Sequence, residues 1–150
     1  MMVCMTELNP TQDFELSLDK SRLDLDRIEE MIRTTYWASQ RSRHAILLSI
    51  EHSLCLGAYR RNDGLQVGFA RLVTDHMSFA WVSDVMVDVS ARGQGIGMAM
   101  MAALTSLPGF EDVRFVLSTR DAHGLYEKYG FKPLPHPELW MIRAPEGETF

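Results

Sequence analysis

The feature that most constrains the fold is a glycine-rich turn between a strand-like and a helix-like segment. Residues 80–89, AWVSDVMVDV, are rich in β-branched residues, and helix formers follow up to about residue 107. Between them, Gly93, Gly95 and Gly97 fall on alternate positions. Glycine destabilises an ordered turn unless the turn needs bare backbone or a positive φ. The pattern therefore predicts a strand–turn–helix unit whose turn exposes backbone N–H groups.

The remaining patterns predict a mixed α/β domain. Asp63-Gly64 is a strong hairpin signal, and Pro108-Gly109 ends the helix after the glycine turn. Strands are expected at residues 13–18, 54–60, 66–74, 80–89, 113–119 and within 131–143, and helices at 24–36, 42–52, from the turn to about 107, and 121–130. This order predicts one domain over residues 1–150, with an antiparallel first half and a strand–helix–strand crossover in the second.

Composition limits the classes of partner. The net charge of −5 disfavours nucleic-acid binding, which usually shows a basic stripe. Cys4 and Cys55 lack metal-site or disulfide spacing, so no metal is expected, and Cys55 is expected to be a small core residue. We expect a cytoplasmic protein that binds no membrane, because residues 1–10 lack a signal-peptide pattern and no apolar run reaches membrane-spanning length.

The glycine turn is a candidate anion site. The run Arg92-Gly93-Gln94-Gly95-Ile96-Gly97 aims several backbone N–H groups and the positive end of a helix dipole at one point. It is not a P-loop, because Met98 stands where a lysine is required. It is not a dinucleotide fingerprint, because Met98 or Met100 stands where the third glycine belongs in either register.

Residues 92–97 match instead the R/Q-x-x-G-x-G/A motif of the GNAT superfamily of N-acetyltransferases. Residues 121–133, DAHGLYEKYGFKP, are similar to the family's A-x-x-L/F-Y-E-K-x-G-F helix. The matching positions are Ala122, Leu125, Tyr126, Glu127, Lys128, Gly130 and Phe131. The chain therefore resembles a GNAT acyltransferase. The resemblance implies a mixed α/β fold, with a mostly antiparallel twisted sheet flanked by helices and with its fourth and fifth strands splayed apart.

The resemblance also implies acetyl-CoA as the acyl donor and a primary amine, on a small molecule or a protein, as the acceptor. The donor-binding positions it implies are Val85, Met86 and Val87 on the strand, Arg92, Gly93, Gln94, Gly95, Ile96, Gly97 and Met98 at the turn, and Thr119 and Tyr126 beyond it. The turn amides would hold the pyrophosphate, and the strand backbone would pair with the pantetheine arm and stabilise the oxyanion. Thr119 stands where the family often has Asn, and a hydroxyl offers fewer hydrogen bonds than an amide.

Tyr126 and Asp84 are the predicted catalytic groups. The resemblance makes Tyr126 the candidate acid, and its phenol, with a pKa of about 10, can protonate a leaving thiolate whose pKa is about 8.5. Asp84 is a candidate base or ammonium-binding group, because a carboxylate inside an apolar strand is costly unless it is used; a hydrogen bond to a loop is the alternative. His123, on the same helical face as Tyr126, is a second candidate base. Without a GxSxG motif or an activated cysteine, we expect direct attack by the amine in a ternary complex.

The sequence leaves the acceptor open. Tyr36, Trp37, Asp75 and His76 are candidates to line a small-amine pocket, and equally they are candidate core and rim residues. The alternative function is a sensor module of the same fold that binds acyl-CoA with weak or no catalysis. A homodimer through an exposed sheet edge or the C-terminal segment is compatible with the sequence.

Overall fold

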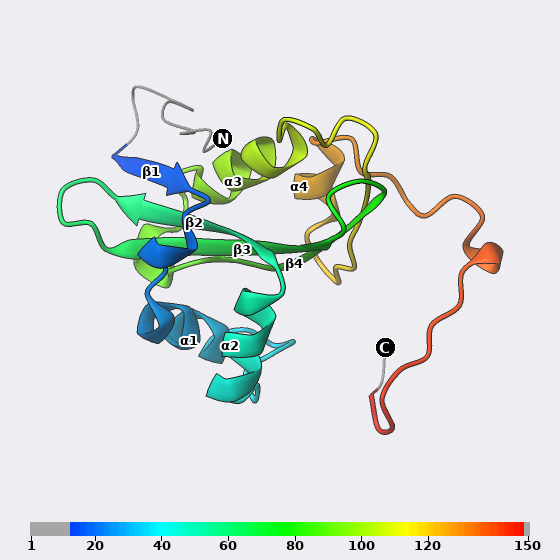
Figure 1. Ribbon diagram of the computed structural model, residues 1–150, viewed down its shortest axis with the longest axis horizontal. Coiled ribbons are helices and arrows are strands. Elements are labelled where there is room, and N and C mark those ends of the chain that lie inside the picture. Colours follow the sequence, from blue (N-terminus) through cyan, green and yellow to red (C-terminus); the bar gives the residue numbers. More distant parts are fainter. Residues whose placement is uncertain (1–12, 149–150) are drawn as a thin grey trace.

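The strands and helices form one five-stranded sheet with helices on both faces (Figure 1). The computed structural model describes residues 13–148, so the expectation for Cys4 lies outside the described residues. The elements are β1 (Phe14–Ser17), α1 (Leu25–Arg33), α2 (Arg43–Glu51), β2 (Leu54–Arg60), β3 (Gln66–Thr74), β4 (Phe79–Val87), α3 (Ile96–Thr105), β5 (Arg114–Val116) and α4 (His123–Glu127), with short 3-10 turns η1 (Lys20–Arg22), η2 (Val89–Ala91) and η3 (Pro137–Leu139).

The sheet has the order β1-β2-β3-β4-β5. Neighbours from β1 to β4 are antiparallel, whereas β5 is parallel to β4 and is reached through α3, as the predicted crossover requires. Pairing between β4 and β5 runs only from Phe79↔Arg114 to Trp81↔Val116. The rest of β4, Val82 to Val87, has no β5 partner, which confirms the expected splay of the fourth and fifth strands.

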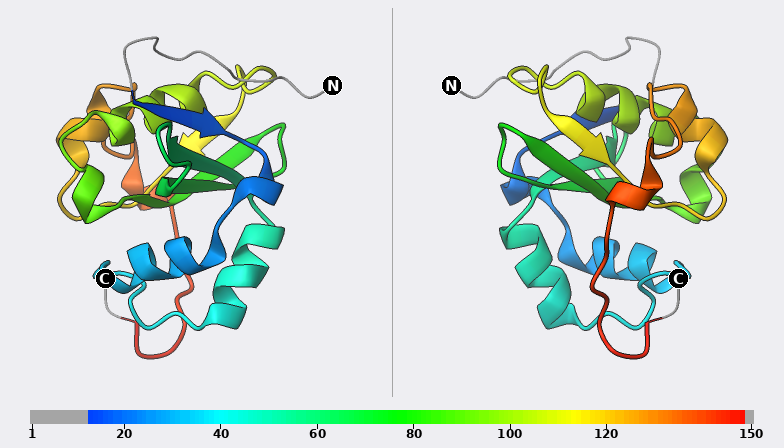
Figure 2. Two further views of the ribbon diagram at one scale, coloured as in Figure 1. Left: turned by 90° about the vertical axis from the view of Figure 1, so that its left-hand side faces the viewer. Right: turned by 90° about the vertical axis from the view of Figure 1, so that its right-hand side faces the viewer.

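Alternating side chains fill two cores, one on each face of the sheet. In β2, Cys55 packs with α1 and α2 while Leu56 packs with α3; in β3, Phe69 and Ala70 divide in the same way. Figure 2 shows α1 and α2 on one side of the sheet and α3 on the other. The buried position of Cys55, which is 2% exposed, confirms its predicted core role.

A glycine on β3 lets α3 approach the sheet closely. A Cβ at Gly68 would lie 2.9 Å from the Cβ of Ala58 and 3.2 Å from side-chain atoms of Ile96 and Met100. Such distances are below ordinary van der Waals contact, so a side chain here would push the first turns of α3 outward. Gly68 therefore fixes where the glycine-rich turn sits relative to the sheet.

A buried polar network fixes the end of β4. Arg27 of α1 donates to the Gln66 carbonyl at 3.2 Å and to Asp88 at 3.0 Å. Asp88 directly follows β4 and also accepts from the Ser90 amide at 3.0 Å. These contacts hold the chain between β4 and the glycine turn against α1.

Most predicted elements are confirmed, and the side chains of Asp24 and Ser42 cap the helices expected from residues 24 and 42 by accepting from backbone amides three residues on. The expected strand within 131–143 is wrong. After Val116 the described residues form only α4 and η3, and Pro133, Pro135 and Pro137 remove the backbone donors that a strand needs. Among residues 13–148, no helix is both long and apolar enough to cross a membrane.

Candidate functional site

The glycine turn after β4 needs glycine for its backbone conformation. Gly93 and Gly95 have φ values of 78° and 80°, in the left-handed region that strains other residues. No atom lies within 4 Å of a Cβ built at either position, so the space beside the turn is open. A Cβ at Gly97 would meet only Val87, at an ordinary 3.8 Å. The first two glycines thus shape the turn and leave its surface accessible.

Unused N–H groups line this turn where α3 begins. Ala99 is the first helical donor, to the Gly95 carbonyl at 3.0 Å, so the amides of Ile96, Gly97 and Met98 have no acceptor within the helix. Gly95, the N-cap residue, provides no side chain to satisfy them. Together with the positive helix end, these amides form a cradle that fits a pyrophosphate.

Arg92 joins this cradle to the free part of β4. Its Nε donates to the Val87 carbonyl at 3.2 Å, so the guanidinium lies beside the end of the strand. Val85 and Val87 are half-buried against the α3 core, and Met86 is buried on the opposite face. All three residues lie on the stretch of β4 that has no β5 partner, so the backbone groups on this edge are available to an extended ligand.

The second motif lies beside the first. The Tyr129 hydroxyl donates to the Met98 carbonyl at 2.8 Å and so links the end of α4 to the first turn of α3. Thr119 accepts from the Ala122 amide at 3.1 Å and so orders the turn before α4, whose N-cap residue is Ala122. Two sequence motifs separated by β5 thus meet at one place in the fold.

Tyr126 is half-buried on α4, with its ring 5.9 Å from that of Phe131. Burial, together with the nearby acidic groups of Tyr36 and Asp121, raises the pKa of its phenol above the usual value. Among residues 13–148, none forms a hydrogen bond with the Tyr126 hydroxyl. The phenol is therefore protonated at neutral pH and has a donor available.

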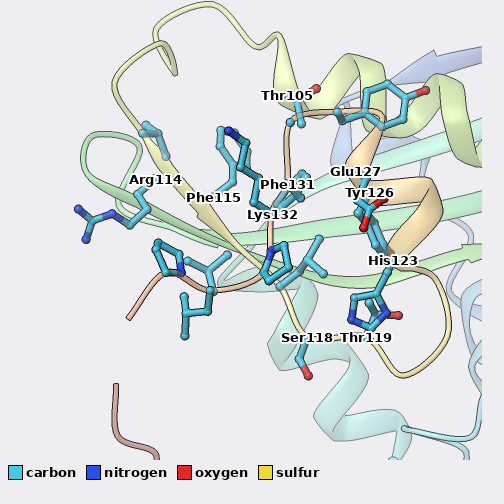
Figure 3. Close-up of a pocket in the computed structure, with 18 of the residues that line it drawn as sticks. Thr105, Arg114, Phe115, Ser118, Thr119, His123, Tyr126, Glu127, Phe131 and Lys132 are labelled. Atoms are coloured by element: carbon cyan, nitrogen blue, oxygen red, sulfur yellow. The ribbon is translucent and has the colours of Figure 1, made fainter. Parts of the chain in front are cut away.

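A cavity of about 1160 Å³ runs along β5, between α4 and residues 131–140 (Figure 3). Thr119, His123 and Tyr126 lie on its wall, and Figure 3 shows Thr119 and His123 together at one end with Arg114 at the other. The structure thus groups three of the expected residues around one open space. The residues of the glycine turn do not contribute to this wall.

Asp84 lies in a charged network at a bulge of β4, where the register with β3 shifts between Phe69 and Arg71. Its side chain is almost fully buried, and Oδ2 accepts from Arg41 Nη1 at 2.6 Å and from Arg71 Nε at 2.7 Å, while Oδ1 accepts from Trp37 Nε1 at 3.3 Å. Burial alone would raise the pKa of this carboxyl, but the bonds and charges of the two arginines outweigh it and hold the pKa below its usual range. Asp84 is therefore ionised, and both of its oxygens have partners.

The expected acceptor residues divide into two groups. Tyr36 and Trp37 lie in the loop after α1, their rings in edge contact at 4.9 Å, and Trp37 reaches Asp84. Asp75 instead accepts three amides of the β3–β4 hairpin, and His76 packs on Phe110. That hairpin is at the opposite end of β4 from the glycine turn, so Asp75 and His76 do not join the site.

Three arginines near the site were not predicted from the sequence. Arg41 and Arg71 bind Asp84, and Arg120 lies with its guanidinium carbon 3.8 Å from the centre of the Tyr36 ring. Arg71 carried a usable signal, because it places one charge in the apolar strand QVGFARLVT beside a strand that contains Asp84. The positions of Arg41 and Arg120, in loops, depend on the tertiary fold.

Comparison with known proteins agrees with this geometry. The family model described as an acetyltransferase (GNAT) domain matches residues 51–133. A crystal structure of a candidate GNAT-family acetyltransferase from Xanthomonas campestris pv. campestris is 39% identical, with a TM-score of 0.83, and the match covers 89% of this chain and 94% of that one. A candidate acetyltransferase from Gibberella zeae is 27% identical over 136 residues, with 77% of each chain covered.

A more distant structure shares only the fold. The diaminobutyrate acetyltransferase of Paenibacillus lautus, solved with its substrate and coenzyme A, is 22% identical with a TM-score of 0.57, over 78% of this chain and 72% of that one. The matched domain, the splayed strands and the glycine turn together define the class of protein. The chain belongs to the GNAT acetyltransferase family and is an acyltransferase.

Proposed function

We propose that this protein transfers an acetyl group from acetyl-CoA to a primary amine, by direct attack of the amine in a ternary complex. The observation that carries the proposal is the cradle of unused amides at Ile96, Gly97 and Met98, next to a stretch of β4 that pairs with β3 on one edge and has no β5 partner on the other. The cradle can bind an anion, and the free edge of β4 can pair with an extended chain. Coenzyme A has both parts, because its diphosphate is followed by a pantetheine arm that contains amides.

The donor contributes a thioester, and the chain's own groups hold it. The amides from Arg92 to Met98, with the side chains of Arg92 and Gln94, bind the pyrophosphate. The backbone of Val85, Met86 and Val87 pairs with the pantetheine arm, and one of its N–H groups stabilises the negative charge that develops on the carbonyl oxygen. Thr119 can still donate its hydroxyl proton, because its oxygen serves only as an acceptor for Ala122.

Tyr126 acts as the acid. A raised pKa keeps its phenol protonated, and the hydroxyl has no competing partner among the described residues. Its proton transfers to the sulfur of the leaving thiolate as the amine displaces it.

Asp84 acts by positioning rather than by accepting the amine's proton. Its low pKa and its occupied oxygens disfavour proton transfer to it, whereas its contacts fix Trp37 and Arg41 beside β4. His123 on the cavity wall is the remaining titratable candidate for the base, with solvent water as the alternative.

Calorimetry with acetyl-CoA and with free CoA tests the donor site. Gly95→Glu should abolish binding, because it adds a negative side chain at the cradle. Gly64→Glu is the matched control: Gly64 also has a positive φ, of 74°, and open space around its Cβ, but lies at the β2–β3 hairpin. An equal loss of acetyl-CoA affinity in both variants would contradict the proposal, as would a lack of acetyl-CoA binding by the unmodified protein. Donor binding without CoA release in the presence of any amine would instead support a sensor of acyl-CoA.

A further inference from the structure

An aromatic and cationic surface lies next to the proposed reaction site. It consists of Tyr36, Trp37, Arg41 and Arg120, hereafter the acceptor rim. Tyr36 and Trp37 are about half exposed although they are large and mainly apolar. Their edge contact, the stacking of Arg120 on Tyr36 and the bond from Trp37 to Asp84 make the rim continuous from the α1–α2 loop to the loop before α4. Apolar rings kept in solvent within such a network indicate a binding surface.

Arg120 is the group in the rim that is free to bind an anion. Its side chain is exposed, and within residues 13–148 no carboxylate lies at ion-pair distance from it. Stacking on Tyr36 uses the flat face of the guanidinium and leaves the N–H groups at its edge available. A guanidinium held in this way is arranged to bind a carboxylate through two parallel hydrogen bonds.

The charge around the rim is positive in an acidic protein. Arg41 and Arg71 share the single carboxylate of Asp84, whereas the whole chain has a net charge of −5. Arg41 donates one hydrogen bond to Asp84, and its side chain is 22% exposed, so further donors face solvent.

The rim also lies within reach of the proposed acid. Trp37 and Arg41 bond to Asp84, which directly precedes Val85 on β4, and Arg120 directly follows Thr119 in the loop that leads into α4 and Tyr126. An acceptor that contacts the rim would therefore have its amine near Tyr126.

We propose that the acceptor is a small amine that also carries a carboxylate, with Arg120 binding the carboxylate and the faces of Tyr36 and Trp37 contacting the carbon chain. This inference rests on the proposed acetyltransferase function and names its acceptor class. Arg120 is a specificity-determining residue here, because it touches the acceptor away from the reacting nitrogen.

Lysine, lysinamide and cadaverine form a matched acceptor series, since they share the side-chain amine and differ in the carboxylate. CoA release should give a kcat/KM for lysine that is about ten- to a hundredfold above that for the other two. Arg120→Gln should reduce this preference to about one, mainly through KM. Arg114→Gln, which removes the same charge at the far end of β5, should keep the preference.

Several outcomes would overturn the inference while leaving the proposed function intact. They are equal rates for lysine and lysinamide, an equal effect of Arg120→Gln on both, faster turnover of O-phosphoethanolamine than of lysine, and acetyl-CoA binding without acetylation of any of these amines. The calorimetry described above distinguishes these outcomes from failure of the proposed function. If the proposed function is wrong, the unmodified protein binds no acetyl-CoA. Arg120→Gln should bind acetyl-CoA with unchanged affinity, which shows that the variant is folded.

Discussion

The part of the chain up to Phe110 forms the buried core, whereas the part after Phe110 contributes mainly residues of the candidate site. Within the described structure, every buried side chain lies between Phe14 and Phe110, and residues 111–148 bury none. Yet the later part carries Thr119, His123 and Tyr126, which line the cavity. The first part therefore holds the fold and the donor cradle, and the second part holds the proposed acid on a thinly packed support.

This difference predicts that stability and activity can be changed separately. Burial and paired charge dominate the free energy of unfolding, whereas a proton donor needs only correct placement and protonation. Substitutions before Phe110 should act first on stability, and those after it first on turnover. Asp84 is the informative intermediate case, because it is buried in the first part but contacts the acceptor rim.

Asp84→Ala should have the largest effect. It leaves the guanidinium groups of Arg41 and Arg71 without their shared carboxylate, and loss of one partner of a buried pair costs about 3–5 kcal/mol. Urea unfolding measures the change. Asp63→Ala, which breaks the exposed pair with Arg60, is the control and should lower the free energy of unfolding much less, because water and salt screen an exposed pair. Similar losses in the two variants would show that the Asp84 network contributes little.

Leu104→Ala and Leu125→Ala compare the two parts directly. Leu104 on α3 is fully buried, so its truncation should lower the free energy of unfolding by about 2–5 kcal/mol. Leu125 on α4 is only half-buried, and its truncation should cost about 1 kcal/mol. The same denaturation experiment applies, and a larger loss for Leu125 would contradict the contrast.

Tyr126→Phe should lower kcat about a hundredfold and leave stability and acetyl-CoA affinity nearly unchanged. Tyr129→Phe is the matched control on the same segment, because it also removes one phenolic hydroxyl but breaks only the bond to Met98. Steady-state kinetics with a saturating amine measure both. If turnover is unchanged in Tyr126→Phe, Tyr126 is not the acid.

The acid stability of the protein should show the smallest effect. The pKa of Asp84 is lower in the folded state than the unfolded value of about 3.9, so its contribution is present above that pH and is lost as the pH falls through the folded pKa. Asp84→Asn should therefore flatten the decline in urea midpoint between about pH 5 and pH 2. If the urea midpoint of Asp84→Asn falls with pH as steeply as that of the unmodified protein, other carboxylates cause the loss of stability in acid.

The sequence predicts the parts of this structure that local patterns determine. Periodicity locates β2 and β3 with their observed bounds, and it places the first two helices to within one residue of their observed starts. The two motifs locate the glycine turn and α4. Long-range pairing is what local patterns miss: β5 is shorter than expected, and the partners of Asp84 come from β3 and from a loop.

The strand predicted within 131–143 failed for a related reason. Extended apolar residues indicate strand propensity, but a strand exists only when another strand accepts its hydrogen bonds. Leu139, Met141 and Ile142 are accordingly exposed, and none of the described residues from 131 onward pairs with β5.

The short parallel pairing of β4 with β5 also bears on the order of folding. The antiparallel neighbours β2 and β3 are joined by a tight turn, so their pairing closes a short loop early. β5 reaches β4 only after the whole of α3, so its pairing closes a longer loop than the β2–β3 hairpin and is entropically more demanding than that pairing. Substitutions in the β2–β3 hairpin should therefore slow folding, whereas those in β5 should mainly accelerate unfolding. On this view the splayed strands that receive the donor are completed late in folding.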